Sequence, residues 1–209
     1  RDYVQEYSLT ANFDLSSANF VRFFRVQSQD NNIYGLDFNN DGTMMYITGH
    51  QNDSIHQYEL AVGFDLSDVT FLRSQDLSTQ SITPSNIEFN TDGTRMFIIG
   101  TFEKTVNQYD LSTGFDISTL SHVGFLDLSS EESLPYGLAF SPSGLKMFIT
   151  GSSKKVSEYT LNCPFTLFSG NCPSVTENSD RTGIAIAQIE VATRTIEHST
   201  DTALNRLKW

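Results

Sequence analysis

Cysteine, tryptophan and basic residues are scarce in this chain of 209 residues, which holds 2 Cys, 1 Trp and 13 Lys and Arg. Two cysteines are too few for a zinc site, and their spacing is not that of a redox motif. The basic residues are outnumbered by 25 Asp and Glu, which leaves a net charge of −12. Such a chain repels phosphate backbones, so we expect no nucleic-acid partner.

Long apolar runs and a signal sequence are also lacking. No stretch approaches the roughly 18 apolar residues of a membrane-spanning helix. The chain opens on Arg1 within a strand-like pattern, so we expect a piece of a longer protein. Aromatic residues, in contrast, are plentiful: 16 Phe and 8 Tyr are too many for a disordered polymer and can supply a core.

A sequence block that occurs three times decides the fold class. Its turn glycines are Gly42, Gly93 and Gly144, which lie 51 residues apart each time. The three copies of the block are Tyr34–Gly49, Ser85–Gly100 and Tyr136–Gly151. A second block follows each copy, at Ile55–Leu60, Val106–Leu111 and Val156–Leu161, and an earlier copy stands alone at Val4–Leu9. A third mark is Phe-Asp at positions 13–14, 64–65 and 115–116, reduced to Phe165 in the last copy.

Each repeat predicts four short antiparallel strands. In the first complete copy we expect them at residues 35–38, 44–48, 54–60 and 70–76, with a hairpin turn at Asp41-Gly42. Four strands in every 40–50 residues, approximately, are typical of a β-propeller blade. The fold class predicted is therefore all-β, and the repeated Phe, Met, Tyr and Ile residues are interpreted as packing between blades.

The repeat also predicts the organisation of the chain. We expect half a blade over residues 1–33, whole blades over 34–84 and 85–135, and a partial blade over 136–162. Propellers usually close with about 4–8 blades. About three blades cannot close a ring, so we expect further blades upstream or from another chain.

The sequence changes character after residue 162. The two cysteines, Cys163 and Cys172, flank a short loop, for which a disulfide and two free thiols are the alternatives. A disulfide would place the segment in the periplasm or outside the cell. Residues 163–183 are predicted as this loop and a polar linker, and residues 184–209 as a helix that needs a partner surface. Residues 1–180 carry 9 basic and 22 acidic side chains, whereas residues 181–209 carry 4 and 3.

Alternate polar residues at the first hairpin give a weak candidate for a calcium site. Asp37, Asn39 and Asp41 match the start of a calcium-binding loop, but Thr48 stands where the bidentate Glu would be. This set of residues is lost from copy to copy, which favours a plain hairpin turn over a cation site. The equivalent residues are Glu88, Asn90 and Asp92 in the second copy, and Ala139, Ser141 and Ser143 in the third.

No other pattern indicates catalysis or a cofactor. His50 is at a strand end without a second ligand in its motif, and His56 is expected to face solvent because Asn107 and Ser157 replace it in the other copies. The acidic residues are interpreted as a solvated surface, with a face for cationic or calcium-bridged partners as the alternative. They are Asp65, Asp68, Asp76, Asp110, Asp116, Asp127, Glu131 and Glu132.

Two segments resemble known families. The repeat Phe-x-x-Asp-Gly-x-x-Met-Phe/Tyr-Ile-Thr-Gly, with the following Gln-Tyr-Asp-Leu type block, resembles blades of secreted bacterial β-propellers of the lactonase-like and NHL/WD40-like group. This resemblance covers residues 1–162. Residues 189–209 resemble the segment before the outer-membrane barrel of some alphaproteobacterial autotransporters. That second resemblance implies an exported passenger domain and a helix that docks in a membrane barrel.

Three functions are compatible with these observations. The first is a non-enzymatic, surface-exposed propeller for recognition or adhesion of a protein or glycan ligand, tethered to an autotransporter barrel. The second is a lactonase-like enzyme, which needs converging His, Arg or Glu side chains in the central channel. The third is a structural module of a phage tail or surface layer. We expect the first, without catalytic or cofactor-binding residues.

Overall fold

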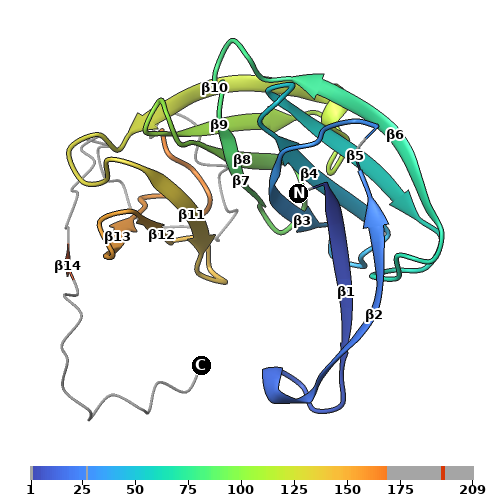
Figure 1. Ribbon diagram of the computed structural model, residues 1–209. Coiled ribbons are helices and arrows are strands. Elements are labelled where there is room, and N and C mark those ends of the chain that lie inside the picture. Colours follow the sequence, from blue (N-terminus) through green and yellow to red (C-terminus); the bar gives the residue numbers. More distant parts are fainter. Residues whose placement is uncertain (1, 27, 169–193, 196–209) are drawn as a thin grey trace, which may run out of the picture.

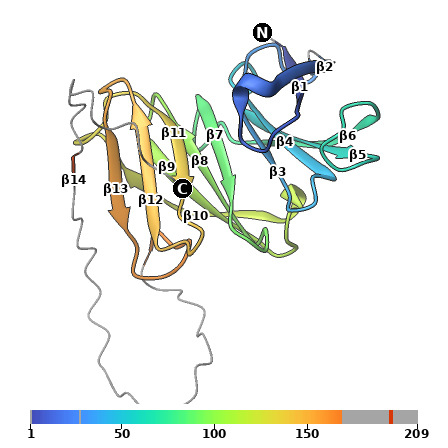
Figure 2. The ribbon, with the colours of Figure 1, turned by 90° about the horizontal axis from the view of Figure 1, so that it is seen from below.

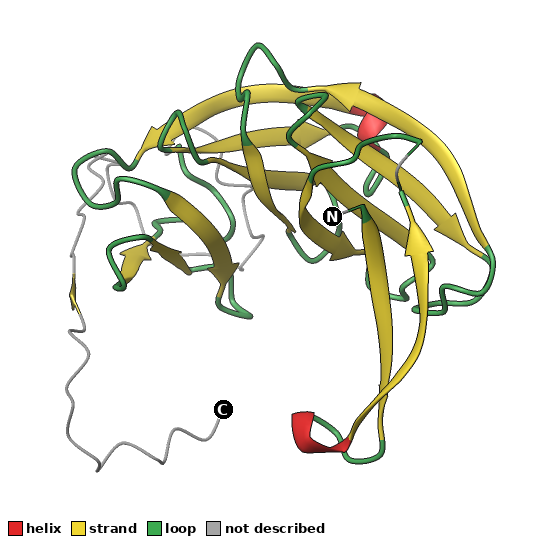
Figure 3. Cartoon of the chain, viewed as in Figure 1, coloured by secondary structure: helices red, strands yellow, loops and turns green. Residues whose placement is uncertain are grey.

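The protein is an all-β, partial β-propeller (Figure 1; Figure 3). The computed structural model describes residues 2–26, 28–168 and 194–195. Three four-stranded antiparallel sheets and one two-stranded sheet follow one another along an arc, as the repeat predicts. The predicted fold class is therefore confirmed.

The two central sheets are complete blades in chain order. The predicted strands of the first blade appear within two residues of their expected bounds, because turn and apolar pattern mark both ends of each strand. The first blade consists of β3 (Ile33–Phe38), β4 (Met44–Gly49), β5 (Ser54–Leu60) and β6 (Val69–Asp76). The second consists of β7 (Pro84–Phe89), β8 (Arg95–Gly100), β9 (Thr105–Leu111) and β10 (Leu120–Asp127).

The two outer sheets differ from this plan. The N-terminal sheet has only β1 (Tyr3–Leu9) and β2 (Ala18–Arg25), and we call it the half blade. The third blade has β11 (Pro135–Phe140), β12 (Lys146–Gly151), β13 (Val156–Thr160) and the two-residue β14 (Arg194–Thr195). Short 3₁₀ helices, η1 (Leu15–Ser17) and η2 (Ile117–Thr119), precede β2 and β10.

The predicted C-terminal helix is wrong at the two residues of its range that the structure describes. Arg194 and Thr195 form β14, which pairs with Glu158 and Ser157 of β13 and so takes the fourth-strand position of the third blade. The open edge of β13 supplies backbone partners that the helical spacing of the sequence does not reveal. The remainder of residues 184–209 lies outside the described residues.

The first strand of each blade is the innermost. Strands β3, β7 and β11 lie toward the concave side of the arc, while β6 and β10 form its outer rim (Figure 1). Strand β7 adjoins both β3 and β11. The view turned by 90° shows the successive sheets side by side with their inner strands near the middle (Figure 2). Residues at equal repeat positions on the inner strands are therefore brought together.

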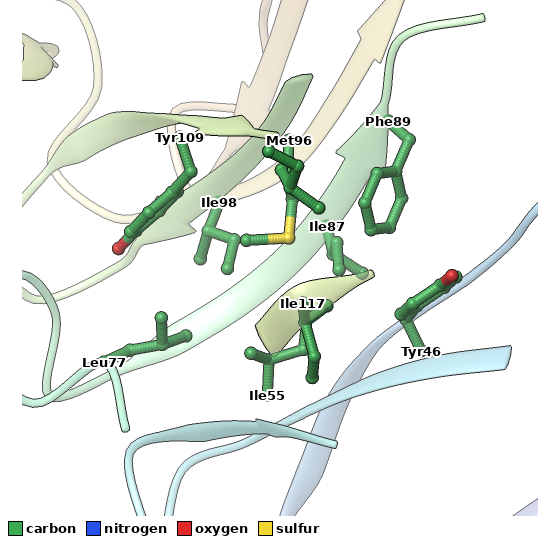
Figure 4. Packing of buried hydrophobic residues seen from close by; sticks show 10 residues of the cluster. Tyr46, Ile55, Leu77, Ile87, Phe89, Met96, Ile98, Tyr109 and Ile117 are labelled. Atoms are coloured by element: carbon green, nitrogen blue, oxygen red, sulfur yellow. The ribbon is translucent and has the colours of Figure 1, made fainter. Parts of the chain in front are cut away.

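The core lies between the blades, as the aromatic and aliphatic pattern predicts. Strand β4 is buried on both faces: Met45 and Ile47 pack toward the half blade, whereas Tyr46 packs toward the second blade. Figure 4 shows one of these interfaces, in which residues of two blades interleave. Because the middle strands of the first and second blades contact a blade on either side, alternate polar residues on them are also removed from solvent.

A corner built on phenylalanine recurs in each of the three blades, in the loop that follows the third strand. Phe64, Phe115 and Phe165 have positive φ angles of 60°, 63° and 50°, a conformation that bulky side chains rarely adopt. Each ring lies over the turn glycine of its own blade, and a Cβ on Gly93 would come within 2.3 Å of Phe115 Cδ2. The backbone N–H of Phe115 also donates to the carbonyl of Gly93 at 3.0 Å. We call this arrangement the Phe corner.

Candidate functional site

A hollow of about 290 Å³ lies where the inner strands of the three blades end. The strands β3, β7 and β11 and the turns that follow them supply most of its lining. Two carboxylates, Asp37 and Glu88, face it from equal positions of β3 and β7. The third blade has Ala139 at that position, so the pair is confined to the junction of the first two blades.

Asp37 is held by backbone donors on both strands. Its Oδ1 accepts from the N–H of Phe38 at 2.8 Å, and its Oδ2 accepts from the N–H of Phe89 on β7 at 3.1 Å. Burial raises the pKa of Asp37, and these two N–H groups act in the opposite direction. The carboxylate therefore bridges neighbouring blades through their backbones.

Glu88 has no such partner among the described residues. Burial, followed by the charge of Asp37, raises the pKa of Glu88 to about 7. A carboxyl group with that pKa exchanges its proton near neutral pH. Because no described side chain or N–H donates to it, its oxygen atoms remain available to a bound molecule.

The rest of the hollow is aromatic and neutral. Aromatic walls come from the inner strands and from two Phe corners, and the rim carries amides and hydroxyls. The wall residues are Phe38, Phe89, Phe115, Phe140 and Phe165, and the rim includes Asn40, Asn90, Thr91 and Ser141. The described lining contains no Lys or Arg, so the site has negative charge without a counterion.

The calcium candidate has its oxygen atoms engaged in a turn. Asn39 Oδ1 accepts from the N–H of Met44 at 2.9 Å, and Asp41 Oδ1 accepts from the N–H of Thr43 at 3.0 Å. Asp37 is bonded across to Phe89, as described above. These contacts give Asn39 and Asp41 a structural role in the hairpin and Asp37 a structural role between two blades, and calcium binding by the three stays a prediction.

A smaller hollow, of about 100 Å³, lies at the opposite ends of the inner strands. The ring of Tyr34 meets that of His50 edge-on at 6.0 Å between centroids, and His50 Nδ1 is 2.9 Å from the carbonyl of Ile82. Tyr34 and Tyr136 are both exposed there. The lining is completed by Thr83, Ser85 and Thr101. This hollow has aromatic and hydroxyl groups but no carboxylate.

The expectation that His56 faces solvent is wrong. Its side chain on β5 is only 3% exposed and lies near Asp30. His56 Nδ1 is 2.7 Å from Ser74 Oγ, while its Nε2 has no hydrogen-bond partner. Burial lowers the pKa of His56, although the charge of Asp30 acts against this. The strand alternation misleads here because both faces of a middle strand are covered by neighbouring blades.

The expectation of a solvated surface is wrong for one of the eight acidic residues, Glu132, which is 3% exposed. It accepts from the N–H of Leu134 at 3.2 Å, from Ser152 Oγ at 3.0 Å and from the N–H of Ser153 at 3.2 Å. Burial alone would raise its pKa, but these donors lower it. Glu132 therefore fixes the loop before β11 rather than covering the surface.

The described residues contain neither a candidate membrane-spanning helix nor a cluster of metal ligands. No helix there has the length and apolar character needed to cross a membrane. No three His, Cys, Asp or Glu side chains in that part of the chain group as a metal site would require. Cys163 is buried, but Cys172 lies outside the described residues, so their disulfide stays a prediction.

Comparison with known proteins supports the fold. A scan against protein-family models finds no match, and a search of curated proteins finds none either. Among solved structures, a protein of Bacteroides uniformis assigned as a 6-phosphogluconolactonase matches with a TM-score of 0.51 and 13% identity, over 75% of this chain and 46% of its own. One of Bacteroides fragilis with the same assignment gives 0.51 and 14%, over 76% and 44%.

A third match is the periplasmic gluconolactonase of Pseudomonas aeruginosa, with a TM-score of 0.48 and 16% identity, over 68% of this chain and 38% of that one. The chain thus spans less than half the length of these three proteins. At these identities the likeness concerns the fold, and the two Bacteroides structures show that the chain has a β-propeller-like fold.

Proposed function

We propose that this chain is part of a lactonase-like β-propeller enzyme that hydrolyses a neutral, sugar-type lactone in the hollow around Asp37 and Glu88. The observation that carries the proposal is the pair of carboxylates, Asp37 and Glu88, which face one aromatic hollow from neighbouring blades. Burial there, followed by the charge of Asp37, raises the pKa of Glu88 to about 7. The structural neighbours assigned as lactonases support the same reaction class. The non-enzymatic expectation has no comparable support.

Lactone hydrolysis needs a group that takes a proton from water and returns it to the leaving oxygen. Glu88 has the required property, because a base with a pKa near the working pH combines ionisation with useful basicity. In the proposed step Glu88 accepts a water proton while the water oxygen bonds to the lactone carbonyl carbon. The ring ester C–O bond then breaks, and the proton passes from Glu88 to the ring oxygen, which gives the hydroxy acid.

Asp37 acts through Glu88 rather than on the substrate. Burial raises the pKa of Asp37, and its two backbone hydrogen bonds act in the opposite direction, toward its charged form. That charge adds to burial, the larger cause, in raising the pKa of Glu88. Asp37 is therefore a positioning residue in this proposal. Replacing it by Asn would remove the like charge and lower the pKa of Glu88.

The charge of the hollow selects among lactones. Two carboxylates face it, its described lining has no Lys or Arg, and the chain has a net charge of −12. A phosphorylated lactone would be repelled, whereas a neutral polyol lactone can use the amides and hydroxyls of the rim and stack on the phenylalanine rings. We therefore place the substrate among unphosphorylated lactones.

The experiment is hydrolysis of glucono-δ-lactone and its 6-phosphate by the chain, corrected for the spontaneous reaction. We expect hydrolysis of the neutral lactone, with a rate that rises with pH through about 7 as Glu88 ionises. Glu88→Gln should lower the rate by about 10²–10⁴-fold, whereas Glu59→Gln, an exposed carboxylate on β5, should not. Asp37→Asn should move the midpoint of the pH profile downward. A wild-type rate in Glu88→Gln, or no hydrolysis by the chain, would overturn the proposal.

A recognition function is the second candidate, and the smaller hollow is the observation that favours it. Exposed tyrosines are common in binding surfaces because they bury a large area at low entropic cost. Tyr34 and Tyr136 flank that hollow from two blades. Binding of neutral oligosaccharides that is lost in Tyr34→Ala and Tyr136→Ala, with no effect of Glu88→Gln, would favour this function. The autotransporter tether and an outer-membrane or extracellular location stay predictions, because they rest on residues outside the described part.

A further inference from the structure

A serine, a histidine and an aspartate come together on the first blade, and none of the three lines either hollow. Ser74 lies on β6, the outer strand of that blade, and His56 lies opposite it on β5. Asp30 comes from the loop between β2 and β3. Ser74 is exposed, whereas the side chains of His56 and Asp30 are 3% and 0% exposed. One accessible hydroxyl group is thus joined to two buried titratable side chains.

The strand register holds the side chains of Ser74 and His56 close together. In the same register, the N–H of Leu77 donates to the carbonyl of Asp53 at 2.8 Å. Hydrogen-bonded and non-hydrogen-bonded pairs alternate along an antiparallel ladder, so Ser74 and His56 form a pair of the second kind, in which side chains are closer. His56 Nδ1 lies 2.7 Å from Ser74 Oγ. The same alternation turns the backbone N–H of Ser74 toward the outer edge of β6.

Asp30 determines which nitrogen of His56 carries the proton. The N–H groups of Asn32 and Asn52 donate to the Asp30 carboxylate at 2.7 and 3.0 Å and fix its position. Its Oδ2 lies 4.0 Å from His56 Nε2, which has no hydrogen-bond partner among the described residues. A proton on Nε2 is attracted by this negative charge, whereas a lone pair there would be repelled. The favoured tautomer therefore leaves Nδ1 unprotonated, so that it accepts the hydrogen atom of the Ser74 hydroxyl.

The second blade folds without these three side chains. At the positions of the serine, the histidine and the aspartate, the repeat places Phe125, Asn107 and Ser81. Side chains that the blade architecture required would recur at these equal positions. The cluster is therefore specific to the first blade, which favours a site over a packing element.

The surroundings of Ser74 favour a small, apolar ligand. Phe71 is 41% exposed, and its ring packs edge-on against Tyr58 at 5.5 Å between centroids. Tyr58 and His56 are two residues apart on β5, so their strand partners Phe71 and Ser74 lie on one face of the blade. An apolar group can rest on the Phe71 ring while a carbonyl carbon meets the hydroxyl group. The N–H of Ser74 at the sheet edge can donate to the oxygen of that carbonyl.

We propose that Ser74 is a nucleophile that small esters with an apolar acyl or aryl group acylate, with His56 as its general base. Ser74 Oγ bonds to the ester carbonyl carbon while His56 Nδ1 takes the hydroxyl proton. The ester C–O bond then breaks, and the same proton passes to the leaving oxygen, which gives acyl-Ser74 and the free alcohol. Burial lowers the pKa of His56, so the imidazole is neutral near neutral pH and accepts the proton. Asp30 is a positioning residue, because at 4.0 Å it acts on the imidazole through its charge.

The test measures acetylation of the chain by p-nitrophenyl acetate, with each acetylated serine located by fragment mass spectrometry after an acid quench. Ser78 is the internal reference, because it is also exposed but its N–H donates to the carboxylate of Asp76, at 2.8 Å. We expect Ser74 to react about 10²-fold faster than Ser78, or faster still. Its rate should be constant above neutral pH and fall in acid, as His56 takes up a proton. The measurement follows acyl-Ser74 itself, so its result is independent of lactone hydrolysis around Glu88.

Three variants separate the roles of the cluster. His56→Asn introduces the residue of the second blade and should slow acetylation of Ser74 by about 10²-fold or more. Asp30→Asn should slow it by about tenfold or more and move the midpoint of the pH profile downward, because the charge that stabilises the imidazolium is gone. Ser78→Ala should leave the rate at Ser74 unchanged, and circular dichroism checks the fold of each variant. Equal rates at Ser74 and Ser78 in the original chain would overturn the proposal, and so would an unchanged rate at Ser74 in folded His56→Asn.

Discussion

The second blade and the half blade share a corner sequence but differ in what surrounds it. Phe115 and Phe13 have φ angles of 63° and 61°, so the local backbone is the same in both. Phe115 packs over Gly93 and against the core, whereas Phe13 is 99% exposed. The difference teaches that the corner conformation is set by its own few residues, while its contribution to stability depends on the hairpin opposite.

The largest expected effect separates these two phenylalanines. Phe115→Ala should lower the free energy of unfolding by about 3 kcal/mol, the lower end for a core Phe because the ring is only partly buried. Phe13→Ala should change it by less than about 0.5 kcal/mol, as at an ordinary surface position. Urea unfolding followed by circular dichroism measures both. Equal losses would show that Phe13 is covered in solution.

The turn glycine gives the next largest effect. Gly93→Ala places a Cβ at a φ of 71° and within 2.3 Å of the Phe115 ring. Strain and overpacking together should cost about 2 kcal/mol. The double variant with Phe115→Ala should cost less than the sum of the two single losses, because the ring that the methyl group meets is gone. Strict additivity in thermal or urea unfolding would contradict the described corner.

The caps of the two 3₁₀ helices should behave more alike. Asp116 accepts from the N–H of Ser118 at 3.0 Å, and Asp14 accepts from that of Ser16 at 2.9 Å. Each Asp→Ala variant should lose the stabilisation of its cap, which for Asp116 is about 1 kcal/mol. Asp116→Ala should lose up to about 1 kcal/mol more, because Arg73 pairs with Asp116 from the preceding blade. Unfolding of the two variants side by side measures the difference.

The smallest expected effect is a shift in the pKa of the Asp116 carboxyl group. Hydrogen bonds from Ser118 lower the pKa of Asp116, with Arg73 adding to this, whereas Ser16 alone lowers that of Asp14. A lowered carboxyl pKa gives stability that is present above the ordinary Asp value and is lost as pH falls through the folded value. Arg73→Gln should raise the pKa of Asp116 and leave that of Asp14 unchanged. NMR titration of both carboxyl groups checks this, and parallel shifts would contradict it.

The fold could be predicted from the sequence because the repeat marks it several times over. The turn at Asp41-Gly42, the alternation of residues 54–60 and the 51-residue spacing all point to the same blade. The packing role of the aromatic residues follows from the same pattern, since they recur at equal positions. Agreement between local and global signals is what makes such a prediction succeed.

The candidate site could be predicted only in part. Asp37 and Glu88 occupy equal repeat positions, a signal visible in the sequence, but their pairing depends on inner strands of neighbouring blades that adjoin. The raised pKa of Glu88 depends on burial and on the charge of Asp37 from the neighbouring blade, neither of which spacing along one strand reveals. His56 is expected at the surface for the same reason, because one blade alone does not show what its neighbours cover. Glu132 is buried differently, by its hydrogen bonds to the loops before β11 and after β12, and the sequence pattern does not reveal these either.

The ion pairs between blades also bear on the order in which the blades should unfold. Arg22 forms an ion pair with Asp65, and Arg73 forms one with Asp116, in each case on the following blade. Each of these ion pairs therefore joins two neighbouring blades. An array of this kind behaves as a one-dimensional series, in which each unit is stabilised by its own folding and by its interfaces. Among the described residues the half blade and the third blade each have one such interface, whereas the first and second blades each have two. Within this part of the chain, opening should therefore begin at the outer sheets, with the first and second blades among the last to lose their protected amides.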